Sequence, residues 1–152
     1  APLADPLSEA TETRCGDFES PPFSLQSMLR GTAMSLRHTV LRLVALVGGL
    51  LVLAPLHFIP VAGSVLWLIT SWAWSAFWLA VEHVSTPAAR HLSPLSQVVK
   101  ALRAHPALAL GLGASLWALL WVPLVNVFLL PVAVVAGTLA FRALRAAGHF
   151  AR

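Results

Sequence analysis

The sequence predicts an all-α integral membrane protein built from two proline-broken helical hairpins and amphipathic helices at the membrane surface. Hydrophobic residues make up 58% of the 152 residues and charged residues only 11%, whereas soluble domains carry roughly 25% charged residues. Two stretches, 43–81 and 106–140, contain no formal charge. Each is longer than the roughly 20 apolar residues of one spanning helix, and prolines near its middle interrupt a single helix. Each stretch is therefore expected to enter the bilayer and return.

The N-terminal segment, residues 1–23, differs in composition from the rest of the chain. It is polar and rich in proline, it holds five of the six acidic residues, and it is predicted to be a loop with a short helix near 7–13. Residues 24–152 are predicted to form the helical membrane domain. Its first helix is expected to begin at Ser24, a good N-cap, and to end at Leu53, with an amphipathic first half at the membrane surface.

The first hairpin is predicted over residues about 43–81. Its turn is assigned to Pro55, Pro60 and Gly63, which lie between two uninterrupted apolar runs. Proline lacks the backbone N–H that a helix interior needs, and glycine tolerates turn conformations.

A polar connector is predicted over residues 83–105, and its second part is amphipathic. The second hairpin is predicted over residues about 106–145. Its turn is assigned to Pro123 and Pro131, with Asn126 between them.

Basic residues gather in three segments that flank the hairpins. These are Arg30, Arg37 and Arg42, then Arg90, Lys100 and Arg103, then Arg142, Arg145 and Arg152. If each apolar stretch enters the membrane and returns, all three segments lie on one side. Basic segments favour the cytoplasmic side, so the charge pattern supports two hairpins over two single crossings.

The sequence is compatible with two depths of the hairpins in the membrane. An arm of roughly 17 residues is about 26 Å long, slightly shorter than a hydrocarbon core of about 30 Å. The tips are free of charge, so they either cross the membrane or stop inside it. Backbone that turns inside the membrane needs protein or a water-filled cavity around it, which favours an oligomer or a solute pathway.

Four polar residues are candidates for an anion pathway. Arg37 and Arg42 lie where the first helix enters the bilayer, where they either attract an anion or extend to lipid headgroups. His57 and Asn126 lie at the two apolar tips, where polar groups need partners. They either fix the turns or line a pathway. Glu82, the one acid beyond the N-terminal segment, is expected to pair with Arg90 or Lys100, with proton coupling as the alternative.

Several function classes have no support in the sequence. It shows no nucleophile–base arrangement, phosphate-binding loop or metal-ligand cluster, so we expect no enzyme, no cofactor and no metal. The cations lie beside apolar helices rather than in a basic stripe with interleaved aromatics, so we expect the lipid bilayer or an anionic solute as partner and no nucleic acid. The single Cys15 excludes an internal disulfide.

Three segments, 58–63, 75–83 and 122–138, resemble the CysZ-type sulfate permease family, which groups with the eukaryotic etoposide-induced membrane proteins. The most specific part is the pattern Pro-Leu-hydrophobic-Asn-x4-Pro-x-Ala-Val that begins at Pro123. Residues 1–9 also resemble a segment of the family. The resemblance covers about the C-terminal two-thirds of the family pattern, which implies a fragment that lacks the first long membrane helices.

The resemblance implies passage of sulfate, or a similar oxyanion, across the bacterial inner membrane by a homo-oligomer with partly penetrating hairpins. Two features depart from the family. Where family members carry a Tyr-x-Asp-x-Pro motif, this sequence keeps the proline as Pro87 but has His83 and Ser85 in place of Tyr and Asp. The family's anion-contacting Gly-Leu-Arg segment would precede this sequence. The alternative function is a non-transporting membrane organiser that binds partner proteins through its hairpins.

Overall fold

The computed structural model describes residues 4–15, 25–60, 62–121 and 123–150, and for residues 4–6, 25, 27, 28 and 123–130 it describes the backbone alone. The elements are α1 (Ala4–Arg14), α2 (Leu25–Leu53), the 3₁₀ turn η1 (Ala54–Phe58), α3 (Gly63–Arg90), α4 (Leu95–Ala104), α5 (Pro106–Leu120) and α6 (Pro123–Ala146). Every regular element in these described ranges is helical, which confirms the predicted all-α class.

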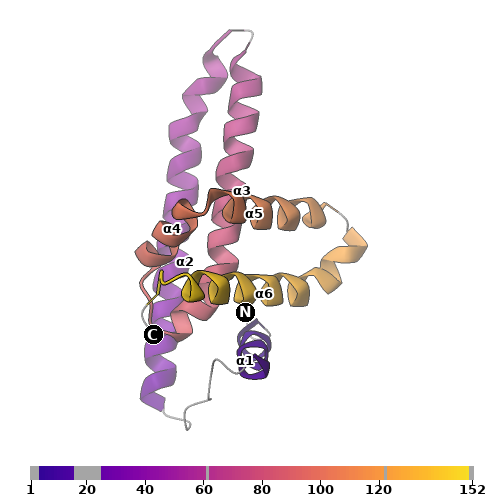
Figure 1. Ribbon diagram of the computed structural model, residues 1–152. Coiled ribbons are helices and arrows are strands. Elements are labelled where there is room, and N and C mark those ends of the chain that lie inside the picture. The colour runs from indigo at the N-terminus through magenta and orange to yellow at the C-terminus, as the bar shows by residue number, and fades with distance from the viewer. Residues whose placement is uncertain (1–3, 16–24, 61, 122, 151–152) are drawn as a thin grey trace.

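Helices α2 and α3 form a long antiparallel hairpin, hairpin 1, whose tip stands well beyond the other helices (Figure 1). Two segments of the described chain, Leu29–Phe58 and Gly63–Arg90, are long and apolar enough to cross a membrane. Pro55 lies in η1, Pro60 follows it, and Gly63 is the first residue of α3. The chain therefore reverses direction within the stretch that the sequence analysis assigned to the first turn.

Helix α3 continues through residues 83–90, which the sequence analysis assigned to a connector. This part of α3 contains Pro87 and is nevertheless helical. Val84, Pro87 and Ala88 are all buried. Packing against neighbouring helices stabilises the last two turns of α3 although their composition is polar, because most helical stability in proteins comes from tertiary contacts.

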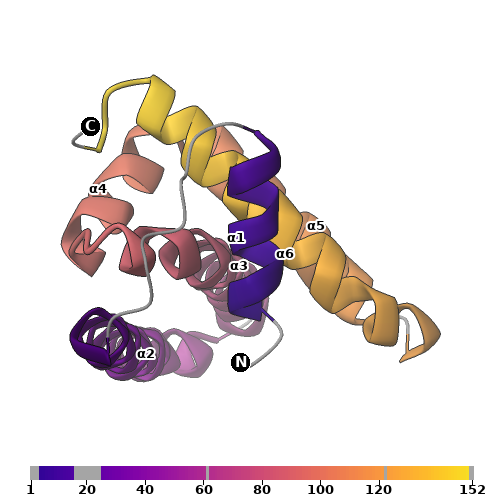
Figure 2. The ribbon, with the colours of Figure 1, turned by 90° about the horizontal axis from the view of Figure 1, so that it is seen from below.

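Helices α5 and α6 form a second antiparallel pair, hairpin 2, that lies crosswise on hairpin 1 (Figures 1 and 2). The sequence analysis assigned a turn to Pro123 and Pro131. This assignment is wrong, because α6 begins at Pro123 and runs through Pro131. Proline suits the first position of a helix, where no intrahelical N–H bond is needed. Asn126 consequently lies in the first turns of α6 rather than at a loop tip.

Two glycines allow hairpin 2 to approach α3 closely. A Cβ atom on Gly113 of α5 would clash with the backbone of Ala76, and one on Gly137 of α6 would lie 2.6 Å from the carbonyl oxygen of His83. Pro87 cannot donate the i+4 hydrogen bond that this carbonyl would receive in a regular helix. The close approach of α6 therefore falls where the backbone of α3 is locally irregular.

Hairpin 1 has two regions with different surroundings. In its outer region, residues 43–72, large apolar side chains are exposed. Examples are Val44, Leu51, Val52, Phe58, Val65, Leu68 and Ile69. In its inner region, residues 76–90, α3 is covered by α1, α4, α5 and α6, and its Val81 and Val84 pack in a core with Leu102 and Phe141. Apolar surface on the scale of the outer region needs a lipid or protein cover.

The N-terminal helix α1 lies across α6 and also contacts α3, as the view along hairpin 1 shows (Figure 2). It is longer than the short helix expected near 7–13. Ser8 and Thr138 share a buried hydrogen bond of 3.0 Å between their hydroxyl oxygens. Helix α1 is thus fixed to α6.

Candidate functional site

An ion pair joins α2 to the inner region of α3. The Nη2 of Arg42 donates to Oε1 of Glu82 at 3.3 Å. The expected pairing of Glu82 with Arg90 or Lys100 is therefore wrong. The side chain of Arg42 is 18% exposed and that of Glu82 is 46% exposed, so water reaches the pair and screens it.

His38 lies one turn before Arg42 on α2 and is almost completely buried, with 3% of its surface exposed. Its ring faces the backbone of Ser85 and Ser93, but neither ring nitrogen makes a hydrogen bond to a described residue. Buried polar groups normally have a protein or water partner, so a water molecule is the expected partner of His38. The sequence analysis did not select this residue, because a histidine in an amphipathic helix looks like part of the polar face.

The four predicted pathway residues do not converge on one site. Arg37 is exposed and, within the part of the chain that the structure describes, forms no ion pair. His57 lies at the other end of hairpin 1, roughly 20 Å from Arg42 along the helix axis. The backbone of Asn126 lies in α6, but its side chain is outside the described atoms.

At the tip, the exposed His57 packs edge-on against Trp67, with ring centroids 5.8 Å apart. Its Nδ1 also lies 3.5 Å from the hydroxyl oxygen of Ser64. These contacts link η1 to the first turns of α3. The geometry around His57 is that of a residue that fixes the turn.

A second ionic cluster holds α1 against the end of α3. Oε2 of Glu12, whose side chain is 1% exposed, accepts a hydrogen bond from Nη1 of Arg90 at 3.0 Å and lies 3.4 Å from Nε2 of His91. The ring of His91 in turn stacks on Phe141 of α6. The sequence carries one signal of this arrangement, because Ser8 and Glu12 are four residues apart and share a helix face.

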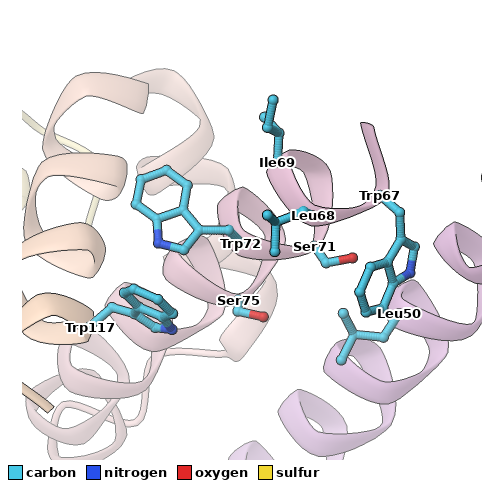
Figure 3. Close-up of a pocket in the computed structure, with 8 residues that line it drawn as sticks. All are labelled: Leu50, Trp67, Leu68, Ile69, Ser71, Trp72, Ser75 and Trp117. Carbon is cyan, nitrogen blue, oxygen red and sulfur yellow. The ribbon is translucent and has the colours of Figure 1, made fainter. Parts of the chain in front are cut away.

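A pocket of about 710 Å³ opens between α2, α3 and α5. Figure 3 shows Trp72 and Trp117 on one side of it, Trp67 on the other, and the hydroxyl groups of Ser71 and Ser75 between them. Trp72 and Trp117 meet edge to face with ring centroids 6.1 Å apart. No charged residue lines this pocket among the described residues, so its chemistry suits an apolar group rather than a bare anion.

Residues 1–131 match the family model described as sulfate transporter CysZ/etoposide-induced protein 2.4. The chain belongs to this family. Curated CysZ relatives are similar to the chain over 91% of its length. The sulfate transporter CysZ of Pseudomonas syringae pv. tomato is 29% identical over 143 residues, that of Pseudomonas aeruginosa 30% over 141, and that of Salmonella typhi 25% over 138.

This CysZ-family chain spans about half the length of the curated relatives that it matches, 54–56% of each. The names of these relatives describe sulfate transporters, and transporters are not enzymes. Together with the two apolar helices of spanning length, the family membership supports a membrane location.

The structure also shows the contacts of Ser85 and His83, the two residues at which the sequence departs from the pattern expected of the family. Ser85 is buried and donates a hydrogen bond of 2.9 Å to the carbonyl oxygen of Glu82. His83 packs its backbone and Cβ against Gly137. Both residues serve the packing of α3 in the described structure.

Proposed function

We propose that the protein containing this chain passes sulfate, or a similar inorganic oxyanion, across the bacterial inner membrane. The observation that carries the proposal is the similarity to CysZ sulfate transporters over 91% of the chain. The helical membrane fold agrees with it. We further propose that the protein is not an enzyme and that it acts as a homo-oligomer, whose protomers would cover the exposed apolar surface of hairpin 1.

The lengths of the helices support a particular topology for residues 24–152, which we propose as one membrane domain. Helices α2 and α3 have 29 and 28 residues and are each about 42 Å long, enough to cross a core of about 30 Å. Helix α5 has 15 residues and is about 22 Å long, too short to cross. Hairpin 1 therefore crosses the membrane in this proposal, whereas hairpin 2 enters it only partly.

The three basic segments fit the cytoplasmic side in this proposal. The first turns of α2, the end of α3 and the end of α6 lie on the side of the molecule away from the tip of hairpin 1 (Figure 1). Cysteines at positions 30, 91 and 149 are expected to react with a membrane-impermeant thiol reagent from the cytoplasmic side, after Cys15 is replaced by serine. Labelling of position 91 from the periplasmic side would contradict the topology.

Among the pathway candidates, Arg37 is the first to test. Because it is exposed and has no ion pair among the described residues, its charge is available to an incoming oxyanion, whereas the charge of Arg42 is partly neutralised by Glu82. Oxyanions are held well by guanidinium groups through charge-assisted hydrogen bonds. His57 and Asn126 remain secondary candidates for the far end of the pathway and for hairpin 2.

The proposal is tested by flux of labelled sulfate into liposomes that contain the purified full-length protein, with chloride and phosphate as competitors. Saturable flux that prefers sulfate is the expected result. Arg37→Gln is expected to lower it several-fold, and Lys100→Gln, an exposed charge on α4, serves as the control. If folded, inserted protein gives no flux above empty liposomes, the transport proposal fails and the membrane organiser becomes the hypothesis to test.

A further inference from the structure

A groove distinct from the tryptophan pocket lies where α4 and α5 meet hairpin 1. It encloses about 460 Å³ and is lined by all four of these helices. Helix α3 contributes the stripe Thr70, Ala73, Trp74 and Phe77, whose spacing of three and four residues places all of them on one helix face. Two of its lining residues, Leu53 and Thr70, belong to the outer region, so the groove extends into that region.

The groove is elongated along hairpin 1. Residues 70–77 of α3 rise about 10 Å along the helix axis. Leu53, the last residue of α2, lines the groove next to the tip, and Leu102 and Leu110 line it from α4 and α5. An extended apolar chain that lies parallel to hairpin 1 matches this shape.

Arg103 is the charged residue in the lining of this groove. It is exposed, it lies in the last turn of α4, and it has no hydrogen bond or ion pair to any residue that the structure describes. The indole N–H of Trp74, by contrast, is already used, because it donates to the carbonyl oxygen of Leu46 at 3.1 Å. The groove thus combines an apolar floor with one available cation.

Helix α4 is suited to the boundary between lipid and water. Leu95, Val98 and Leu102 are buried on one face, whereas Lys100 and Arg103 are exposed. Amphipathic helices of this kind lie in the interface plane, with their cations at the level of the headgroups. The tip of hairpin 1 stands beyond α4 (Figure 1), so a lipid whose headgroup is at Arg103 would direct its chain towards the tip, along the groove.

We propose that this groove binds one anionic phospholipid, with an acyl chain against the α3 stripe and the phosphate at Arg103. A basic residue near the surface of an anionic membrane contributes roughly 1 kcal/mol of attraction, which is about a fivefold change in affinity. The argument for a lipid rests on charge complementarity, and it does not depend on sulfate passage.

A second copy of the chain fits the groove less well. Beyond the N-terminal segment the sequence offers a single carboxylate, Glu82, and Glu82 already pairs with Arg42. Apolar helices from a neighbouring copy could fill the floor of the groove, but the charge-free stretches 43–81 and 106–140 carry no carboxylate for Arg103. An anionic phospholipid supplies both the chain and the charge.

Native mass spectrometry of the full-length protein tests the proposal, with protein released from nanodiscs of phosphatidylcholine that contain one-fifth phosphatidylglycerol. The expected result is one retained phosphatidylglycerol per protomer. Arg103→Gln is expected to reduce the retained fraction about fivefold. Lys100→Gln, which removes an exposed charge from the same helix but does not line the groove, is expected to leave it unchanged.

A second variant tests the apolar part of the groove. Ala73→Leu adds bulk to the floor without a change in charge, and it is expected to lower retention of phosphatidylglycerol while the variant keeps the melting temperature of the parent. Equal loss in Arg103→Gln and Lys100→Gln would show a general surface-charge effect and overturn the proposal. Full retention in both Arg103→Gln and Ala73→Leu would also overturn it, as would an increase in dimer without lipid loss in Ala73→Leu.

Discussion

The outer and inner regions of hairpin 1 share helix α3 but have different surroundings. In the outer region, residues 43–72, Leu51, Val52 and Leu68 are 68%, 78% and 62% exposed, whereas in the inner region Val81 and Val84 are completely buried. The difference shows that α3 is a membrane helix in one half and the central core helix of a small helical domain in the other. The same kind of substitution should therefore lower the free energy of unfolding much more in the buried core than in the outer region.

The largest expected effect compares one core residue with one exposed residue. Phe141→Ala removes a ring that is 1% exposed and contacts His91 and Phe150, and it should lower the free energy of unfolding by about 3–5 kcal/mol. Leu68→Ala in the outer region should lower it by less than about 0.5 kcal/mol. Thermal unfolding in mild detergent measures both. Similar losses for the two variants would mean that the outer region is covered by protein.

The second prediction tests the crosswise contact of hairpin 2. Gly113→Val places a branched side chain against the backbone of Ala76 and should cost about 3 kcal/mol. Gly111 is the matched control, because a Cβ atom there meets nothing within 4 Å. Gly111→Val should therefore be nearly neutral in the same thermal assay. Equal tolerance of both substitutions would place α5 elsewhere on α3.

A smaller effect is expected where α1 is fixed to the inner region. Glu12→Gln keeps the size of the side chain but removes the charge that faces Arg90 and His91. The loss should be about 2 kcal/mol, below that of a fully buried pair, because both partners are partly exposed. Hydrogen exchange of α1 is the direct measurement and should become faster. The control is Thr13→Ala, since the hydrogen bond of Thr13 among the described residues goes to the carbonyl oxygen of Glu9 in its own helix.

The smallest effect is expected at the ion pair inside hairpin 1. A double-mutant cycle of Arg42→Gln and Glu82→Gln should give a coupling energy below about 1 kcal/mol, because Glu82 is 46% exposed and solvent screens the pair. The coupling should fall further at high salt. A value of several kcal/mol would show that the membrane or another protomer excludes water from this site.

Much of the fold follows from local patterns in the sequence. Charge-free stretches predicted the apolar helices, and the alternation of apolar residues with Lys100 and Arg103 predicted the amphipathic helix that is now α4. The helix expected to end at Leu53 does end there. These features depend on composition and periodicity within one segment, which a single sequence displays directly.

The features that the sequence did not predict depend on contacts between distant segments. Residues 83–90 are helical because α1, α4 and α6 cover them, and Pro131 lies in a helix rather than in a turn. The partners of Glu82 and Glu12 are separated from them by 40 and 78 residues. A proline by itself predicts a turn, and a charged residue by itself predicts a partner nearby in the sequence. At each of these positions, packing between distant segments decided the structure instead.

The hydrogen bond between Ser8 and Thr138 has a consequence for the order of assembly during synthesis. The two residues are 130 positions apart, and chains grow at roughly 5–20 residues per second. Helix α1 is thus made about 6–26 seconds before its binding surface on α6 exists. Hairpin 1 can enter the membrane during this interval, and the docking of α1 can take place only after α6 has been made and placed.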